Sequence, residues 1–146
     1  MFSRIDHVGI ACHDLDASIA FYRDTFGFTV SHEEVNEEQG VREAMLRANG
    51  TDDGQASYIQ LLQPLREDSP VGKFLARNGE GVHHVAFGTD DVAAAGQAMR
   101  DRGLRTLSEH PRNGSMGSSI MFLHPKDCGG VLTEMVQASG TETHQT

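Results

Sequence analysis

Four polar side chains occupy matched positions in two similar stretches of the sequence. His7 lies in one apolar segment, and His84 lies in a second apolar segment 77 residues further along. Gln60 begins the sequence Gln-Leu-Leu-Gln, and Glu134 begins the sequence Glu-Met-Val-Gln 74 residues further along. Each stretch therefore offers one imidazole and one oxygen ligand, and such internal repetition indicates a repeated architecture.

This set of side chains suits a divalent transition metal, because imidazole nitrogen, amide oxygen and carboxylate oxygen all bind such ions. A structural zinc site would favour thiolates and close all four positions. Since the set has no sulfur, we expect an octahedral ion with two open positions. The alternative is that all four are ordinary strand residues, as a lone strand histidine commonly is. Their matched positions favour the metal site.

Glu43 is a candidate general base within the predicted strand 41–48. Because side chains alternate along a strand, Glu43 shares a face with Val41 and Met45. Burial of a carboxylate among apolar neighbours is costly and would raise its pKa toward the range of a general base. The alternative is a solvated Glu43, because Ala44 and Leu46 make the other face of the strand apolar too.

A stretch rich in glycine and serine, residues 113–119, offers backbone N–H groups and hydroxyls from Ser115, Gly117 and Ser118. It could bind a substrate carboxylate, or it could be a flexible hairpin connection. Lys126, in the turn after the next predicted strand, could contact a phosphate or be a solvated surface charge. These four residues are our candidate substrate contacts.

The elements that must position these residues follow the same order twice. In the first half, Asp14 is a candidate N-cap and Gly27 a candidate C-terminal cap of a helix. A strand is predicted before this helix and three strands after it. The predicted ranges are strand 5–11, helix 15–26, strand 28–33, loop 34–40, strand 41–48, turn 49–54 and strand 56–62.

The second half repeats this order after a connector. Ser69 is predicted to cap a short helix that begins at Pro70. Asp90 or Asp91 is predicted to cap the helix of the second half. The predicted ranges are connector helix 70–78, strand 82–87, helix 92–102, strand 104–109, loop 111–117, strand 118–124, turn 125–130, strand 131–137 and a polar tail 139–146. The sequence therefore predicts an α+β fold of two βαβββ repeats.

Composition excludes several classes of partner. The chain has 146 residues and a net charge of -9, with no basic run. This charge argues against binding to nucleic acid or to an anionic membrane surface. No apolar run approaches the roughly 20 residues that span a bilayer. The first residues lead directly into a predicted strand rather than a signal peptide, so we expect a cytoplasmic protein with Cys12 and Cys128 reduced.

Several motifs resemble the methylmalonyl-CoA epimerase family of the vicinal oxygen chelate (glyoxalase/bleomycin resistance/dioxygenase) superfamily. They lie at residues 38–41, 64–70, 79–84 and 122–134, and the resemblance extends over 5–137. It implies a cupped mixed sheet of paired βαβββ units, and a homodimer. We expect one domain over residues 1–146, with repeat one at about 4–63, a connector at 64–80, repeat two at about 81–138 and a frayed tail at 139–146.

The resemblance also implies roles for individual residues. His7, Gln60, His84 and Glu134 match the family's metal ligands, and Glu43 and Glu134 match its two catalytic carboxylates. We expect one divalent ion per chain, cobalt in the first place, with nickel, manganese or zinc also compatible with these ligands.

The implied reaction is epimerisation of (2R)- and (2S)-methylmalonyl-CoA. It would proceed by α-proton abstraction and reprotonation through a metal-chelated enolate. One alternative is a lyase of the glyoxalase I type, although such enzymes usually carry glutamate where Gln60 stands. A second alternative is a non-catalytic binding module of the same fold, a class that generally lacks the metal ligands.

Overall fold

The computed structural model describes residues 1–48 and 57–140, so the predicted turn 49–54 and most of the predicted tail lie outside the described residues. Within these ranges the chain forms eight strands, three α-helices and two short 3-10 helices. It divides into two compact units, one from His7 to His83 and one that joins Met1–Asp6 to the residues from His84 onward.

The unit from His7 to His83 contains four strands, two of its three neighbouring strand pairs being antiparallel. In the order β2-β3-β4-β1, β2 pairs antiparallel with β3, β3 pairs antiparallel with β4, and β4 pairs parallel with β1. The elements are β1 (Phe2–Ala11), α1 (Leu15–Phe26), β2 (Thr29–Asn36), β3 (Val41–Arg47), β4 (Tyr58–Pro64) and α2 (Pro70–Asn78).

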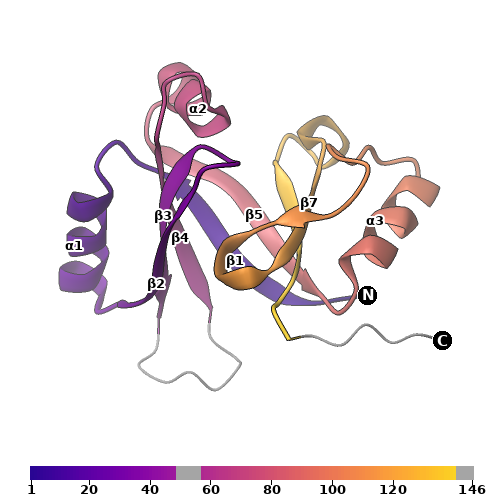
Figure 1. Cartoon of the computed structure of the whole chain (residues 1–146), viewed down its shortest axis with the longest axis horizontal. Helices are drawn as coiled ribbons and strands as arrows, with labels where there is room; N and C mark the ends of the chain where they lie inside the picture. Colours follow the sequence, from indigo (N-terminus) through magenta and orange to yellow (C-terminus); the bar gives the residue numbers. More distant parts are fainter. Residues whose placement is uncertain (49–56, 141–146) are drawn as a thin grey trace. The chain divides into compact units, whose positions relative to one another are not determined.

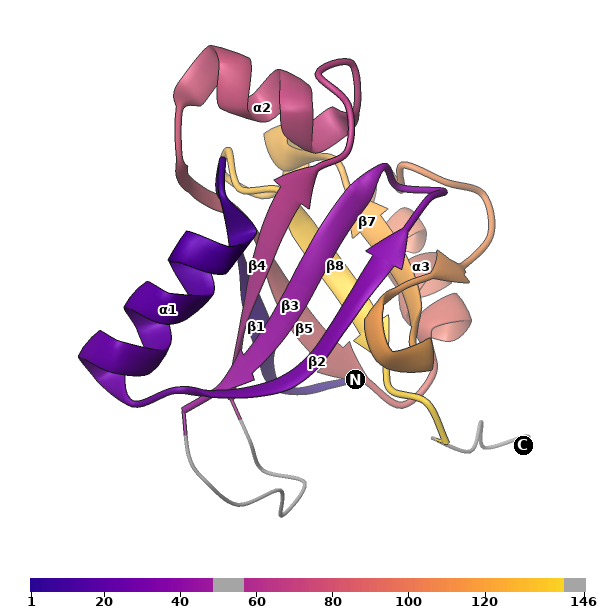
Figure 2. The same cartoon turned by 60° about the vertical axis from the view of Figure 1, so that its left-hand side comes forward.

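Helix α1 begins and ends where its capping residues predict. The Asp14 side chain accepts a hydrogen bond of 3.1 Å from the backbone N–H of Ala17. Gly27 follows the last turn with φ 75°, a left-handed conformation that favours glycine. Leu15 and Ile19 pack with residues of β3 and β4 in one apolar cluster, which fixes α1 on one face of this sheet (Figures 1 and 2).

The second unit repeats this arrangement. Its strand order is β5-β8-β7-β6, with β5 parallel to β8 and the other pairs antiparallel. Met99 of its helix packs with Met121 and Met135 of the sheet. The elements are β5 (Gly81–Thr89), α3 (Val92–Asp101), β6 (Arg112–Asn113), β7 (Ser119–Leu123) and β8 (Thr133–Gln137), with 3-10 helices at Ser115–Gly117 and Pro125–Asp127. The predicted α+β fold of two βαβββ repeats is confirmed.

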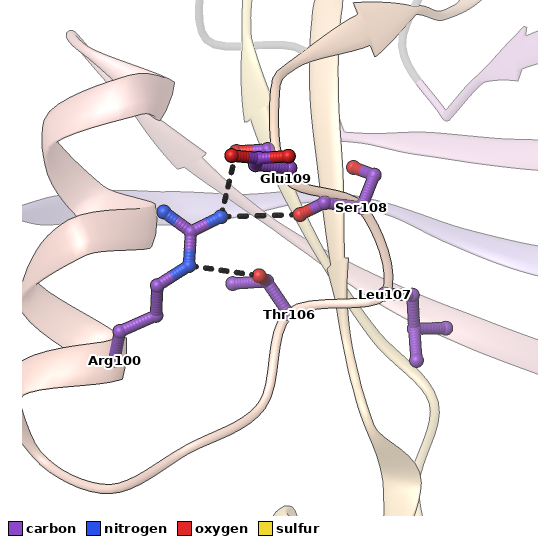
Figure 3. Close-up of a pocket in the computed structure, with 5 residues that line it drawn as sticks. All are labelled: Arg100, Thr106, Leu107, Ser108 and Glu109. Atoms are coloured by element: carbon purple, nitrogen blue, oxygen red, sulfur yellow. Dashed lines mark hydrogen bonds between the residues drawn. The ribbon is translucent and has the colours of Figure 1, made fainter.

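The predicted strand 104–109 is wrong, and Arg100 of α3 gives the physical reason. Its guanidinium donates hydrogen bonds to the Thr106 hydroxyl at 3.0 Å and to the carbonyls of Ser108 and Glu109 at 3.1 and 2.7 Å (Figure 3). These carbonyls are thereby turned toward a side chain instead of a neighbouring strand. The segment keeps one isolated bridge, between Thr106 and Leu123.

Other strand boundaries differ from the prediction as well, and two of the differences concern predicted loops. Strand β6 (Arg112–Asn113) falls inside the predicted loop 111–117, where it pairs with the start of β7. Strand β2 continues through Asn36, although a loop was predicted from residue 34. It continues because Glu34 and Asn36 pair with residues of β3. The polar composition of this edge is typical of a loop, so the sequence alone did not indicate the pairing.

Candidate active site

Three of the expected site residues share one face of the first unit. In the strand register Gln60 lies opposite Gly9 on one side and Met45 on the other. Since directly paired residues share a face, His7, Glu43 and Gln60 all lie on the face opposite α1. All three are buried, with exposed fractions of 4%, 2% and 5%. The prediction that Glu43 is buried is confirmed, and the alternative of a solvated Glu43 is wrong.

Glu43 and Gln60 are joined by a hydrogen bond. The Gln60 Nε2 donates to Glu43 Oε2 at 3.0 Å. Because an ionised carboxylate only accepts hydrogen bonds, this contact requires the nitrogen of the Gln60 amide to face Glu43. The amide oxygen Oε1 then lies on the other branch of the amide group. The same bond offsets part of the cost of burying the Glu43 charge.

The second unit holds the other two expected ligands on its corresponding face. Glu134 of β8 lies opposite Ala86 of β5, two residues after His84, so both side chains occupy the face opposite α3. The His84 Nε2 is 3.6 Å from Glu134 Oε2, and the side chains are 3% and 6% exposed. This separation exceeds a normal N–H···O hydrogen bond. It suits two neighbouring ligands of one ion.

His7 of the first unit, and His84 and Glu134 of the second, are buried side chains of types that bind metal ions. Two imidazole nitrogens and one carboxylate oxygen are donors that divalent transition metals accept. Gln60, the fourth expected ligand, is buried as well.

The two adjacent histidines of β5 have different surroundings. The His84 ring meets the Phe122 ring edge-on, with centroids 5.6 Å apart. The His83 ring meets Phe74 of α2 edge-on at 5.0 Å. Burial lowers the pKa of His83 to about 4, which keeps its imidazole neutral at physiological pH.

The expected substrate contacts lie on two 3-10 helices or, for Ser118, directly after the first of them. Ser115 and Gly117 belong to the first, where Met116 adopts a left-handed φ of 57°. The Ser118 N–H donates to the Ser115 carbonyl at 3.1 Å, so this segment has its own hydrogen bonds. Lys126 is exposed on the second 3-10 helix. Contact between these residues and a substrate stays a prediction.

Sequence reasoning missed three residues near the site. Glu34 of β2 lies opposite Glu43 in the register and shares its face, which only the observed pairing reveals. Gln63 and Gln137 cap helices α1 and α3 from the strands that carry Gln60 and Glu134. Their matched positions were visible in the sequence, but a repeated glutamine does not by itself indicate a cap.

The chain is similar to proteins of one superfamily. Residues 6–122 match the sequence model of the glyoxalase/bleomycin resistance protein/dioxygenase superfamily. The mitochondrial methylmalonyl-CoA epimerase of Mus musculus is 39% identical over 92% of this chain and 73% of that protein. The chain belongs to the methylmalonyl-CoA epimerase family.

Solved structures agree with this membership of the epimerase family. The Streptomyces coelicolor methylmalonyl-CoA epimerase variant E43Q, in complex with 2-nitronate-propionyl-CoA, is 66% identical, with a TM-score of 0.91 over 96% of this chain and 100% of that chain. A methylmalonyl-CoA epimerase in complex with methylmalonyl-CoA and NH4+ is also 66% identical, with a TM-score of 0.92 over 99% of this chain and 100% of that chain. Further structures of the S. coelicolor enzyme carry S115T or Q60A.

The described helices offer no segment long and apolar enough to cross a membrane.

Proposed function

We propose that this chain epimerises methylmalonyl-CoA, moving one proton off and back onto the α-carbon with the help of a divalent metal ion. The observation that carries the proposal is a buried set of two imidazoles, one amide and two carboxylates in a member of the methylmalonyl-CoA epimerase family. The buried set contains both candidate metal ligands and a candidate base.

Similarity to the S. coelicolor enzyme supports the assignment of individual residues. The variants of that enzyme are substituted at Glu43, Gln60 and Ser115. This chain has the same residue types under the same numbers. We therefore assign the site of this chain to the faces of β3 and β4 that carry Glu43 and Gln60, and to the 3-10 helix that carries Ser115.

Glu43 is the proposed first base. An acid as weak as a thioester α-carbon needs an ionised carboxylate close to its proton. The amide N–H of Gln60 stabilises the ionised form of Glu43, and burial excludes water that would compete for the proton.

Glu134 is the proposed second acid–base group, which returns the proton to the other face of the α-carbon. Epimerisation needs two such groups, because a single base would replace the proton on the face from which it came. Glu134 Oε2 is the oxygen nearest to His84. If that oxygen binds the metal, the other carboxylate oxygen remains to carry the proton.

The proposed metal ligands are His7, Gln60, His84 and Glu134. Their donor atoms fit a divalent transition ion, and cobalt is our first choice among cobalt, nickel, manganese and zinc. When bound, such an ion would polarise the thioester carbonyl as a Lewis acid and make the α-proton more acidic. Gln60, being neutral, leaves the site one unit more positive than a glutamate would, which favours an anionic malonyl-type substrate.

Further features belong to the same proposal. Ser115, Gly117 and Ser118 would bind the substrate through backbone N–H groups and hydroxyls, and Lys126 would contact a CoA phosphate. We propose a single domain over residues 1–146, assembled as a homodimer in the cytoplasm.

The test is turnover of single epimers of methylmalonyl-CoA by the purified full chain, before and after removal of metal by a chelator. We expect interconversion of the epimers, its loss with the chelator and its return with Co2+. The hemithioacetal of glutathione serves as the competing substrate. Turnover of the hemithioacetal alone would assign a glyoxalase-type lyase, and turnover of neither substrate by metal-loaded protein would reject an enzyme of either kind.

A further inference from the structure

The strands that carry Gln60 and Glu134 are each tied to the start of a helix by a second side chain. Gln63 Oε1 accepts a hydrogen bond of 2.8 Å from the backbone N–H of Leu15, the first residue of α1. Gln137 Oε1 accepts one of 3.0 Å from the N–H of Val92, the first residue of α3. The same tertiary cap thus occurs in both repeats.

These glutamine caps bind the backbone N–H of the first helical residue, which the local capping residues do not bind. The side chains of Asp14 and Asp91 accept from Ala17 and Ala94, the third residues of their helices. The N–H of the first helical residue is one of the groups that a helix leaves without an internal partner. A glutamine from the neighbouring strand therefore completes the cap, and it links that strand to the helix at one fixed position.

The two glutamines lie on the opposite side of the sheet from the candidate ligands. Leu61, two residues before Gln63 on β4, packs with Leu15 in the cluster under α1. Met135 of β8 packs with Val92 in the cluster under α3. Because side chains alternate, Gln63 shares the helix-facing side with Leu61, whereas Gln60 points to the other side. From that side of the sheet, the glutamines can act on the site through the strand backbone.

We propose that Gln63 and Gln137 are positioning residues. Each fixes the position of its strand, β4 or β8, along the strand axis relative to the helix packed on it, and thereby the position of Gln60 or Glu134. Each lies three residues after a candidate ligand on a short strand of seven or five residues. Ladder hydrogen bonds hold β4 and β8 to their neighbouring strands. Without the cap, the contact of each strand with its helix is left to apolar packing, which is not directional. The proposal rests on the proposed function, since it treats Gln60 and Glu134 as metal ligands.

The test uses the full chain and compares Gln137→Met with Gln137→Glu. Met has a similar volume and no acceptor, whereas Glu keeps an acceptor oxygen that a helix N-terminus favours. Asp91→Ala is the matched control, because it removes a cap of the same helix that has no link to β8. The readouts are the affinity for Co2+ alone, kcat and KM for methylmalonyl-CoA, and amide hydrogen exchange in residues 133–137 of the metal-free protein.

We expect Gln137→Met to weaken Co2+ binding about tenfold, the scale of residues that orient metal ligands. The fold-decrease in kcat should be larger than the fold-change in KM. Amide hydrogen exchange in β8 should become faster. Gln137→Glu should restore all of these, and Asp91→Ala should speed exchange only at the start of α3. Because Gln137 makes further contacts, Gln63→Met is the second variant, with Asp14→Ala as its control and faster exchange in β4 as its expected result.

Equal weakening of Co2+ binding by Asp91→Ala and Gln137→Met would overturn the proposal, because general loss of stability would then explain both. Unchanged exchange in β8 and β4 of the two Met variants would overturn it as well. Failure of the wild-type chain to bind Co2+ or to epimerise would reject the proposed function instead. The exchange in β8 and β4 would still decide whether the glutamines position these strands.

Discussion

Gln60 stands beside a carboxylate and, in the proposed site, also binds the metal. The hydrogen bond of 3.0 Å to Glu43 requires an N–H donor at residue 60. A glutamate there would be a better metal ligand but would put a second negative charge against Glu43 in a buried site. The amide therefore suits a site whose base must stay ionised and whose metal must keep enough positive charge to attract an anionic substrate.

Substitution of Gln60 by glutamate should separate these two needs. We expect Gln60→Glu to bind the metal but to lower kcat at least tenfold, because two buried carboxylates at this distance share a proton and Glu43 loses its role as a free base. Gln97→Glu is the matched control, since Gln97 also donates to a carboxylate, that of Asp101 at 2.9 Å, but on the exposed side of α3. Steady-state rates of both variants measure the effect. Full activity of Gln60→Glu would contradict the assigned role of the amide.

At the scale of elements, each repeat is organised by a helix packed on one face of four strands and by polar side chains buried on the other. The 3-10 helix Pro125–Asp127 lies in the connection from β7 to β8, and a clamp joins it to the segment between α3 and β6. There Arg105 makes two side-chain hydrogen bonds to Asp127, of 3.0 and 3.1 Å, and its backbone N–H donates a third of 2.9 Å. These bonds lower the pKa of Asp127 to about 2.

This clamp predicts a pH dependence of the turn. Because the pKa of Asp127 is lower in the folded chain than its ordinary value near 3.8, its contribution to stability is complete above pH 4 and is lost as the pH falls toward 2. We expect Arg105→Gln to reduce the acid-dependent loss of stability between pH 4 and pH 2, as measured by urea unfolding. The effect should shrink in high salt, since the Arg105 side chain is exposed and that of Asp127 is partly exposed. The same pH profile in variant and wild type would refute it.

How far the sequence predicted these elements depends on how local their causes are. The ends of α1 and the start of α3 follow from Asp14, Gly27 and Asp91, whose capping acts within a few residues. The strand expected at 104–109 does not form, because Arg100, which lies outside the segment, donates hydrogen bonds to two of its carbonyls. Alternation left the burial of Glu43 open, because both faces of its strand are apolar. Its bond to Gln60 required the register of β3 and β4.

At the scale of the whole molecule, each repeat carries two of the proposed metal ligands, His7 and Gln60 in one and His84 and Glu134 in the other. An ion that binds only the folded chain stabilises it by mass action, by about 2.7 kcal/mol when its concentration is 100 times Kd. This ligand set could be proposed from the sequence because the two repeats differ mainly in loop length. The matched positions on their strands therefore remain recognisable.

The metal-free chain should therefore melt several degrees below the chain saturated with metal. The measurement is thermal unfolding with Co2+ and with a chelator. The double variant His7→Ala, His84→Ala should melt at the same temperature under both conditions, because it has lost two of the proposed ligands. A metal-dependent rise in the melting temperature of that variant would show that the ion binds elsewhere.

The central claim is that two carboxylates move the α-proton, and hydrogen exchange during turnover tests it most directly. Each epimer of methylmalonyl-CoA is incubated with the protein in D2O, and deuterium at the α-carbon is followed by NMR. We expect the wild-type chain to give deuterium in the product epimer from either direction. Glu43→Gln should lose at least 100-fold in epimerisation while it keeps its metal. Epimerisation without deuterium uptake, or unchanged rates in Glu43→Gln, would contradict the mechanism.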